Sequence, residues 1–488
     1  MTQPFRFLTL FFPILATALL LGCEKSAEEQ KAVKPAEPKT DNRPITIVIL
    51  EKTEEDHLDL RSVIVREFKA LDLGAPSFVS ATCDQFLQQP LEGDLVLYPP
   101  QLFGDLVYRD LLRPIPGYIV ESEPYRMSDV LRNQRRIFCM HRKERYATSL
   151  GVTSLMLLCR TDVLKANGLE VPTTWNEYES VCLKLATARK NGSLKGMSPD
   201  KTWSPTIEPL ASRWKATTLL ARSASSVRSR NRYSVCFDYS KWNSLIDTPP
   251  FQKSIQQMKT VHDLMDPKHR GMTPREAEQA FRLQQSVLCL SWPHPVSEGS
   301  ALEKGKLEGA EAHLIPGSSS KFDFSSGKWN RSPADERQVQ MIGVGGFCAS
   351  VLRSSPLSSV ATRRLALISG KELSEPIGLA NPESGFPYRA SHLNRSSEWV
   401  SRKYDAPFVE SFSKVIEKQF DATTWIVRPR VQKAEQYELA MANEIEAVFQ
   451  GKSTAEATRE ISARCNQISE SVDIEFQKQV NLESLGVK

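Results

Sequence analysis

Few residue patterns in this 488-residue chain could support catalysis. The segment 451–453 (GKS) resembles the end of a phosphate-binding loop, but the residue five positions upstream of Gly451, where such a loop needs glycine, is Glu446. Ser212 and Lys215 have S-x-x-K spacing, yet the companion β-lactamase motifs are absent from the sequence. The seven histidines show neither an HExxH motif nor paired spacing. The sequence therefore predicts a protein that is not an enzyme and that uses no cofactor and no metal.

The cysteines also lack metal-binding spacing. Beyond Cys23 there are eight, with no close pair and no CxxC motif: Cys83, Cys139, Cys159, Cys182, Cys236, Cys289, Cys348 and Cys465. Three of them lie in apolar runs, which is typical of small buried thiols. We expect mostly free, structural thiols, and disulfide pairing stays open because an exported protein can form it.

Composition and charge describe an ordinary water-soluble globular protein. Apolar residues make up 40% and charged residues 25% of the chain, and the length predicts two or three domains. Lys plus Arg is 63 against 58 for Asp plus Glu, so the formal charge is only +5. That excess is too small to indicate a nucleic-acid partner.

The N-terminal segment predicts export. Residues 1–22 carry one basic residue, Arg6, before an uncharged stretch from Phe7 to Leu21, which is typical of a signal peptide. The sequence LLGC that ends at Cys23 looks like the lipobox of bacterial lipoproteins, so Cys23 is the predicted lipid-bearing residue. The alternative is a plain signal peptide followed by a chance cysteine. Residues 23–43 have almost no large apolar side chains and predict a disordered tether.

Strands and helices alternate in the folded part, which indicates an α/β fold. A β-branched run at 45–50 predicts the first strand, a helix follows at about 58–71, and residues 94–98 predict the next strand. Capping boxes at Thr174–Glu177 and Thr273–Glu276 each predict a helix start. The stretch 203–232 is rich in Ser and Arg with little periodicity, so we expect a solvated loop there.

Further strands are predicted at 146–160, 286–292 and 338–351, the last interrupted by Gly345-Gly346. From about residue 431 the chain predicts two amphipathic helices broken at Gly451-Lys452.

Five passages in this order resemble a known family: GDLVLYPPQLFGDLVYRDLLRPI, SLMLLCRTDVLKANGLEVPTTWNEY, EAEQAFRLQQSVLCLSWP, IGVGGFCASVLRSSPLSSVATRRLALIS and RPRVQKAEQYELAMANEIEAVFQGKSTAEA. They are similar to the family-one extracellular solute-binding proteins, the lipoprotein or periplasmic receptors of ABC importers for sugars and related solutes. The second passage is the most specific. Its Cys159–Asp162 segment keeps the aspartate of the family pattern but lacks the usual aromatic residue.

The resemblance implies a two-lobed periplasmic-binding-protein fold of type II, often called a Venus flytrap, with several hinge crossings. Lobe one would comprise residues 44–150 plus 345–392. Lobe two would comprise residues 151–344 plus 393–488. Several crossings restrict two lobes to a hinge motion, so that a partner can sense closure on a solute.

The resemblance also implies a set of ligand contacts: Trp292, Glu51, Thr53, Tyr98, Thr153, Gly345, Phe347, Arg389 and Tyr437. Trp292 is the strongest candidate, because an indole face can cover the apolar side of a sugar ring. The alternatives are a core position for Trp292 or Tyr98 and plain surface solvation for Glu51 and Thr53. Relatives that bind sugars often carry an aspartate near 151–153, and its absence argues against a simple hexose or a maltose-like ligand.

The resulting functional hypothesis is a lipid-anchored, extracytoplasmic receptor that delivers a carbohydrate or similar polar solute to an ABC permease. Its expected partners are the solute, the permease subunits and the membrane, through the lipid. A receptor that reports the solute to a sensor without transport is the second hypothesis. A glycan hydrolase that uses the same cleft is the third.

Overall fold

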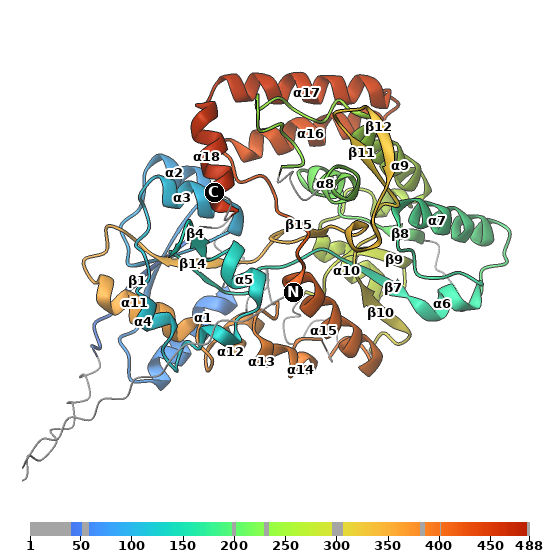
Figure 1. Ribbon diagram of the computed structural model, residues 1–488. Helices are drawn as coiled ribbons and strands as arrows, with labels where there is room; N and C mark the ends of the chain where they lie inside the picture. The colour runs from blue at the N-terminus through green and yellow to red at the C-terminus, as the bar shows by residue number, and fades with distance from the viewer. Residues whose placement is uncertain are drawn as a thin grey trace, which may run out of the picture. The chain divides into compact units, whose positions relative to one another are not determined.

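The computed structural model describes residues 41–50, 58–197, 202–228, 234–294, 306–380, 386–400 and 402–485. The predicted signal peptide, Cys23 and most of the predicted tether lie outside these residues. The described chain forms two mixed sheets, each surrounded by helices, and three small two-stranded pairs (Figure 1). We call the first sheet and the helices packed on it lobe one, and the second sheet with its helices lobe two.

The sheet of lobe one has the strand order β2-β1-β3-β14-β6. Its strands are β1 (Thr46–Leu50), β2 (Ser77–Ala81), β3 (Leu95–Tyr98), β6 (Thr148–Ser149) and β14 (Cys348–Val351). β1 pairs in parallel with β2 and β3, whereas β14 is antiparallel to β3 and β6. Strand β14 thus returns to lobe one after the chain has formed the second sheet.

The first strand buries both of its faces along Ile47 to Leu50. Ile47 packs in one hydrophobic cluster with α1 (Leu58–Ala70) and α11 (Ser358–Ile368). The neighbouring Val48 points to the other face and belongs to the cluster that includes α3 (Phe103–Tyr108). Helices therefore cover both sides of this sheet.

The sheet of lobe two has the order β10-β7-β9-β8. Its strands are β7 (Met156–Arg160), β8 (Ser204–Ile207), β9 (Ser286–Ser291) and β10 (Ala310–His313). Five main helices pack on this sheet or on one another: α7 (Trp175–Lys190), α8 (Trp214–Val227), α9 (Pro249–Leu264), α10 (Pro274–Arg282) and α15 (Ala406–Asp421). α10 contacts β9, and α15 contacts β10.

The prediction of a solvated loop at 203–232 is wrong for most of its length. Residues Ser204–Ile207 form β8, and Trp214–Val227 form α8, whose side chains are nearly all buried. Arg222 is accommodated in this interior because it hydrogen-bonds Glu208 and stacks over an aromatic ring. The Ser and Arg residues suggested solvent, but α8 is buried by the packing of lobe two, and Arg222 is paired with Glu208 there.

The predicted helix starts are confirmed. Thr174 accepts a hydrogen bond from the backbone of Glu177 at 3.2 Å, and the Glu177 carboxylate accepts one from the Thr174 backbone at 3.1 Å. Thr273 and Glu276 form the same reciprocal pair at the start of α10. These side chains satisfy backbone amides that the first helical turn leaves without partners.

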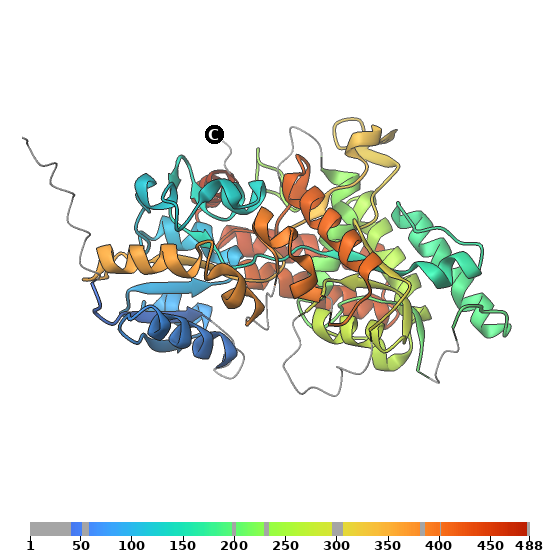
Figure 2. The same ribbon diagram turned by 90° about the horizontal axis from the view of Figure 1, so that it is seen from below.

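Three chain segments run side by side between the two sheets. Thr153 N–H donates to the carbonyl of Gly345 at 3.0 Å, and Leu155 N–H donates to that of Met341 at 3.0 Å. On the other side, β13 (Gln340–Met341) pairs in parallel with β15 (Trp425–Ile426). β15 lies between the sheets in Figure 1, and Figure 2 shows the blue N-terminal strands and the green helices of lobe two on opposite sides of this region.

The prediction of two helices for the C-terminal tail is incomplete, because the structure has three. A third helix, α18 (Ile474–Ser484), follows α16 (Ala434–Phe449) and α17 (Thr454–Glu470). α18 packs on α3 of lobe one, where the rings of Tyr108 and Phe476 lie 3.8 Å apart. The tail therefore reaches back across the molecule, and this contact between distant segments left no signal in the local pattern.

Candidate solute-binding site

Trp292 lies directly after β9, at the end of that strand nearest the crossing segments. Its side chain is 2% exposed, and its ring centroid lies 5.8 Å from that of Trp214 and 4.7 Å from that of His294. The indole Nε1 is buried, and no described residue hydrogen-bonds it. Both ring nitrogens of His294 are likewise buried without a partner in the described chain.

Thr153 and Gly345 meet Trp292 at the crossing. A methyl group on Gly345 would lie 3.1 Å from Thr153 Oγ1 and 3.5 Å from the Trp292 ring, so the three residues are closely packed at the crossing. Thr153 Oγ1 is buried and has no hydrogen-bond partner within the described residues. The structure thus brings three of the predicted contacts together: Trp292, Thr153 and Gly345.

This arrangement is chemically suited to a hydroxylated ligand. Buried polar atoms are almost always hydrogen-bonded in native proteins. The unpaired Trp292 indole N–H and Thr153 hydroxyl could therefore each form a hydrogen bond with a polar ligand. Trp292 packs against Trp214 and belongs to the main hydrophobic cluster, so the alternative of a core position describes its surroundings in this structure, and its role as a ligand contact stays a prediction. We call Trp292, Trp214, Thr153, Gly345 and His294 the crossing site.

Charged residues that sequence reasoning missed lie close to the start of α8. Arg213, which precedes Trp214, forms an ion pair with Glu435 at the start of α16. Burial raises the pKa of Cys83, in the first turn of α2 (Cys83–Gln88), to about 11, and the charges of Glu435 and Arg213 also act on it. Cys83 belongs to lobe one, so Arg213 and Glu435 lie where the two lobes face each other.

Comparison with solved structures establishes the architecture. Maltose-bound MalE3 of T. maritima is similar with a TM-score of 0.61 and 12% sequence identity, over 87% of this chain and 99% of that chain. An ABC transporter solute-binding protein of Agrobacterium radiobacter K84 in complex with ribitol has a TM-score of 0.64 and 14% identity, over 88% and 99%. For the sugar-binding protein MalE of Xanthomonas citri the TM-score is 0.61 at 15% identity, over 88% and 98%.

The fold is that of the two-lobed solute-binding proteins. The likeness covers nearly the whole length of these relatives and confirms the predicted α/β, type II architecture. No protein-family model and no curated protein matches the sequence.

Tyr98 and Phe347 lie in the hydrophobic interior of lobe one. The Tyr98 hydroxyl is 2.8 Å from Ser350 Oγ, and burial raises the pKa of this phenol well above its ordinary value. Phe347 is 4% exposed and packs among the residues that cover β1 and β3. The alternative of a core position describes Tyr98, and we do not include either residue in the crossing site.

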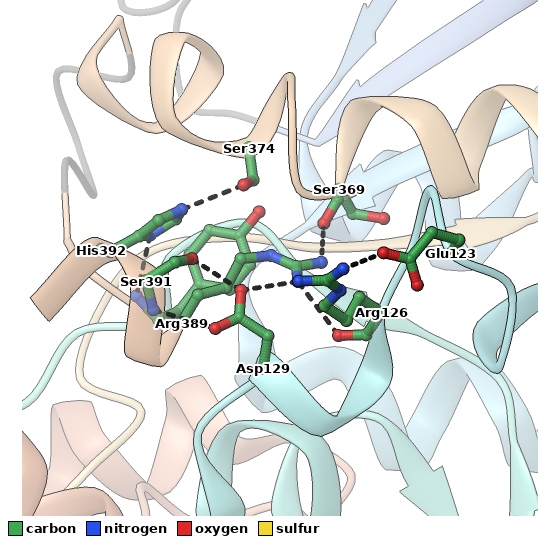
Figure 3. Close-up of polar contacts among 9 residues, drawn as sticks. Glu123, Arg126, Asp129, Ser369, Ser374, Arg389, Ser391 and His392 are labelled. Carbon is green, nitrogen blue, oxygen red and sulfur yellow. Dashed lines mark hydrogen bonds and ion pairs between the residues drawn. The ribbon is translucent and has the colours of Figure 1, made fainter. Parts of the chain in front are cut away.

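Arg389 is enclosed by lobe one and committed to protein partners (Figure 3). Its guanidinium donates to the backbone carbonyls of Arg126 and Ser369 and forms an ion pair with Asp129 at 3.4 Å. Asp129 in turn accepts a hydrogen bond from the Ser391 hydroxyl at 2.6 Å. These contacts hold three separate segments together, which is a structural task and not that of a ligand contact.

Tyr437 also lies away from the crossing site. Its hydroxyl is 3.0 Å from Ser469 Oγ of α17, and its ring packs edge-on against Phe237 at 5.1 Å. The residue therefore joins the helices of the tail. Glu51 and Thr53 lie outside the described residues, so their assignment to the site stays a prediction.

The described chain offers few groups for other chemistry. The described residues contain no group of three or more His, Cys, Asp or Glu placed to hold a metal ion. All eight described cysteines are free thiols. Of the helices that the structure describes, none combines the length and the apolar character that crossing a bilayer requires.

Proposed function

We propose that this protein is an extracytoplasmic receptor of an ABC importer that binds a carbohydrate or related polyhydroxy solute between its lobes. The fold supports this assignment, because the similar structures include complexes with maltose, ribitol and D-mannitol. In the same proposal, Cys23 carries the lipid that anchors the receptor to the membrane. The mature chain delivers its solute to permease subunits and does not alter it.

The observation that carries the proposal is the crossing site itself. Trp292, with an unpaired indole N–H, and Thr153, with an unpaired hydroxyl, meet where the chain passes between the lobes. A hydroxylated ligand supplies the hydrogen bonds that these groups lack and covers the indole face. An unpaired buried hydroxyl lowers the stability of the fold. If position 153 served only to pack the core, an apolar residue of the same shape as Thr153 would be more stable there.

The crossing segments provide the mechanism by which binding is reported. A solute that contacts both lobes stabilises the closed arrangement, and a differential of ~3 kcal/mol changes the closed-to-open ratio more than a hundredfold. The ion pair of Arg213 with Glu435 lies close to α2 of lobe one, so closure changes the charged surface at the lobe boundary. A permease can recognise that surface.

The test begins with a thermal-shift screen of the mature chain against sugars, polyols, amino acids and polyamines. A ligand at one hundred times its dissociation constant stabilises the protein by about 2.7 kcal/mol, which is readily measured. We expect a sugar or a polyol to raise the melting temperature. If only amino acids or polyamines do so, the assignment to carbohydrates is wrong.

Calorimetry on two variants then tests the site. Trp292→Ala should weaken binding by about 2 kcal/mol, roughly thirtyfold in Kd, because an aromatic anchor is lost. Thr153→Val should also weaken binding while leaving stability equal or higher, because it removes an unpaired buried hydroxyl without changing shape. Trp329→Ala is the matched control, since this tryptophan is 39% exposed on a hairpin of lobe two. Unchanged affinity in both site variants would refute the crossing site.

A further inference from the structure

The positive charge of the chain is concentrated in one short stretch of lobe one. Residues 132–145 contain six Lys or Arg side chains and a single acidic one, Glu144. Removing these six from the 63 basic residues of the chain, and this one from its 58 acidic residues, leaves 57 of each. The whole formal charge of +5 therefore comes from this stretch. We call its six cations the basic face: Arg132, Arg135, Arg136, Arg142, Lys143 and Arg145.

A short helix and a hairpin carry the basic face. The helix α5 (Arg132–Ile137) buries one side in the protein and leaves its three arginines exposed or half-buried. The strands β4 (Met140–His141) and β5 (Glu144–Arg145) follow as an antiparallel hairpin. Its tip consists of Arg142 and Lys143, and both side chains are exposed.

The helix and the hairpin lie against each other. Arg145 Nη1 donates to the backbone carbonyl of Arg135 at 3.2 Å, so the hairpin is held to α5. α5 and β4 are also in contact and lie next to each other in Figure 1. The six cations thus belong to one surface of lobe one.

Nearby carboxylates offset only part of this charge. Arg132 forms an ion pair with Asp421 at 3.4 Å, and Arg142 forms one with Glu483 at 2.7 Å. Glu144 on the hairpin is the third carboxylate. Three negative charges against six positive ones leave a net charge of about +3 on this surface. Both arginines in these pairs are partly exposed, and such pairs are weak enough to exchange partners.

The predicted tether enters the same lobe. A Cβ on Gly74 would lie 2.3 Å from the carbonyl oxygen of Asn42, so the start of the described chain packs against the connection between α1 and β2. A flexible tether of 21 residues, 23–43, has a root-mean-square length of roughly 25 Å. A lipid on Cys23 would therefore hold lobe one close to a bilayer.

We propose that the basic face binds the anionic headgroups of the membrane to which the chain is anchored. Clustered Lys and Arg side chains attract anionic lipids, and each cation near the surface strengthens binding about fivefold. A lipid chain and a polybasic patch together anchor a protein more stably than a single lipid chain. An acidic protein would offer the same charge, but the tether favours the membrane because it keeps this lobe beside it. The proposal rests on the lipid anchor of the proposed function and does not depend on the solute.

The test uses the mature chain with Cys23→Ser, which carries no lipid, so that only the protein surface can bind. In sedimentation with vesicles, we expect binding to phosphatidylcholine mixed with phosphatidylglycerol and none to phosphatidylcholine alone. Raising the salt from about 0.1 M to about 1 M shortens the Debye length from about 10 Å to about 3 Å and should release the protein. Equal binding to the two kinds of vesicle would overturn the proposal. So would the absence of binding to either kind, which is the result expected for an acidic protein partner.

A matched pair of double variants locates the binding surface. Arg136→Gln with Lys143→Gln removes two exposed cations that form no ion pair with a described residue, and vesicle binding should weaken about 25-fold. Lys184→Gln with Lys190→Gln is the control, because both lysines are exposed on α7 of lobe two and the net charge changes equally. This control should bind vesicles like the unmodified chain. Equal affinities of the two double variants would refute the basic face.

The solute screen and the vesicle assay fail separately. A chain that binds no sugar or polyol would still be expected to bind anionic vesicles, because the basic face lies on α5 and the hairpin and not at the crossing site. The double variants should keep the melting temperature of the unmodified chain, since all four side chains are exposed. A loss of vesicle binding without a change in melting temperature therefore reports on the surface and not on folding.

Discussion

At the scale of single residues, buried polar side chains in lobe one hold separate chain segments together through hydrogen bonds, and His392 is an example. The ring is 2% exposed, with Nε2 3.0 Å from Ser374 Oγ and Nδ1 accepting a hydrogen bond from the Tyr388 backbone at 3.4 Å. Burial, assisted by the positive charge of Arg389, lowers the pKa of His392 to about 3. The histidine is therefore neutral in the folded protein at physiological pH.

This depressed pKa predicts an acid sensitivity. The unfolded chain binds a proton at His392 below about pH 6.5, whereas the folded chain does not until about pH 3. Because the unfolded state then carries more protons, stability falls as the pH decreases through this window, by up to ~1.4 kcal/mol per pH unit for this one site. Urea unfolding at pH 7, 6, 5 and 4 measures the slope.

The variant His392→Gln removes the titrating group while keeping a polar side chain. We expect a lower stability at pH 7 and a shallower fall toward pH 4 than in the unmodified chain. Parallel curves for the two proteins would show that His392 contributes nothing to the acid sensitivity. The other buried histidines are present in both proteins and cancel in the comparison.

At the scale of elements, the crossing segments are held by close backbone packing and by α15. Gln419 of α15 donates to the carbonyl of Leu155 at 2.7 Å and accepts a hydrogen bond from Ser154. Gly346 has φ +86°, and a Cβ there would lie 2.2 Å from the carbonyl oxygen of Gly151. Only glycine allows the two crossing strands to approach this closely.

The glycine at 346 therefore predicts a large effect for a small change. Gly346→Ala should destabilise the protein by more than about 2 kcal/mol, since left-handed strain adds to a clash with backbone that cannot move aside. Gly168→Ala is the matched control, with φ +66° and no atom within 4 Å of the added methyl group. The Gly168→Ala substitution should lower the free energy of unfolding by only about 1 kcal/mol. Guanidinium unfolding measures both, and equal losses would contradict the packing explanation.

At the scale of the whole molecule, residues 42–488 form one compact unit in spite of having two sheets. Contacts between the lobes reinforce the crossings: α18 packs on α3, and Arg430 donates to the carbonyls of Ile137 and Ser484, each at 2.8 Å. The lobes are thus joined at the crossing segments and again through the tail. Such a linkage permits rotation about a hinge and prevents independent movement of the lobes.

This linkage predicts a change in overall dimensions on binding. Saturating amounts of the solute identified by the thermal screen should decrease the radius of gyration, because a ligand that contacts both lobes favours the closed arrangement. Small-angle X-ray scattering with and without the ligand measures the change. Trp292→Ala at the same ligand concentration is the control and should show a smaller decrease. An unchanged radius in the unmodified, saturated protein would mean that binding does not close the lobes.

Prediction from the sequence succeeded where the signal is local. The first strand at 46–50 and the capping pairs at Thr174 and Thr273 were correctly located, because burial of a β-branched run and satisfaction of helix amides depend on neighbouring residues. Trp292 and Thr153, which the family resemblance assigned to the ligand, lie close to Gly345 in the structure, and their contact with a ligand stays a prediction. Arg389 and Tyr437 were assigned to the ligand, but their partners, Asp129 and Ser469, come from distant segments.

The sequence by itself determined the α/β alternation and the helix starts, since these follow from periodicity and capping chemistry, and the two-lobed fold followed from the resemblance to a known family. Only the tertiary structure decided that α8 is a buried helix and that α18 returns to lobe one. It also decided which polar atoms lack partners, such as Thr153 Oγ1 and Arg222 Nη1. The physical reason is that a polar side chain is stabilised by whichever group replaces its water, and that group is set by contacts between residues far apart in the chain.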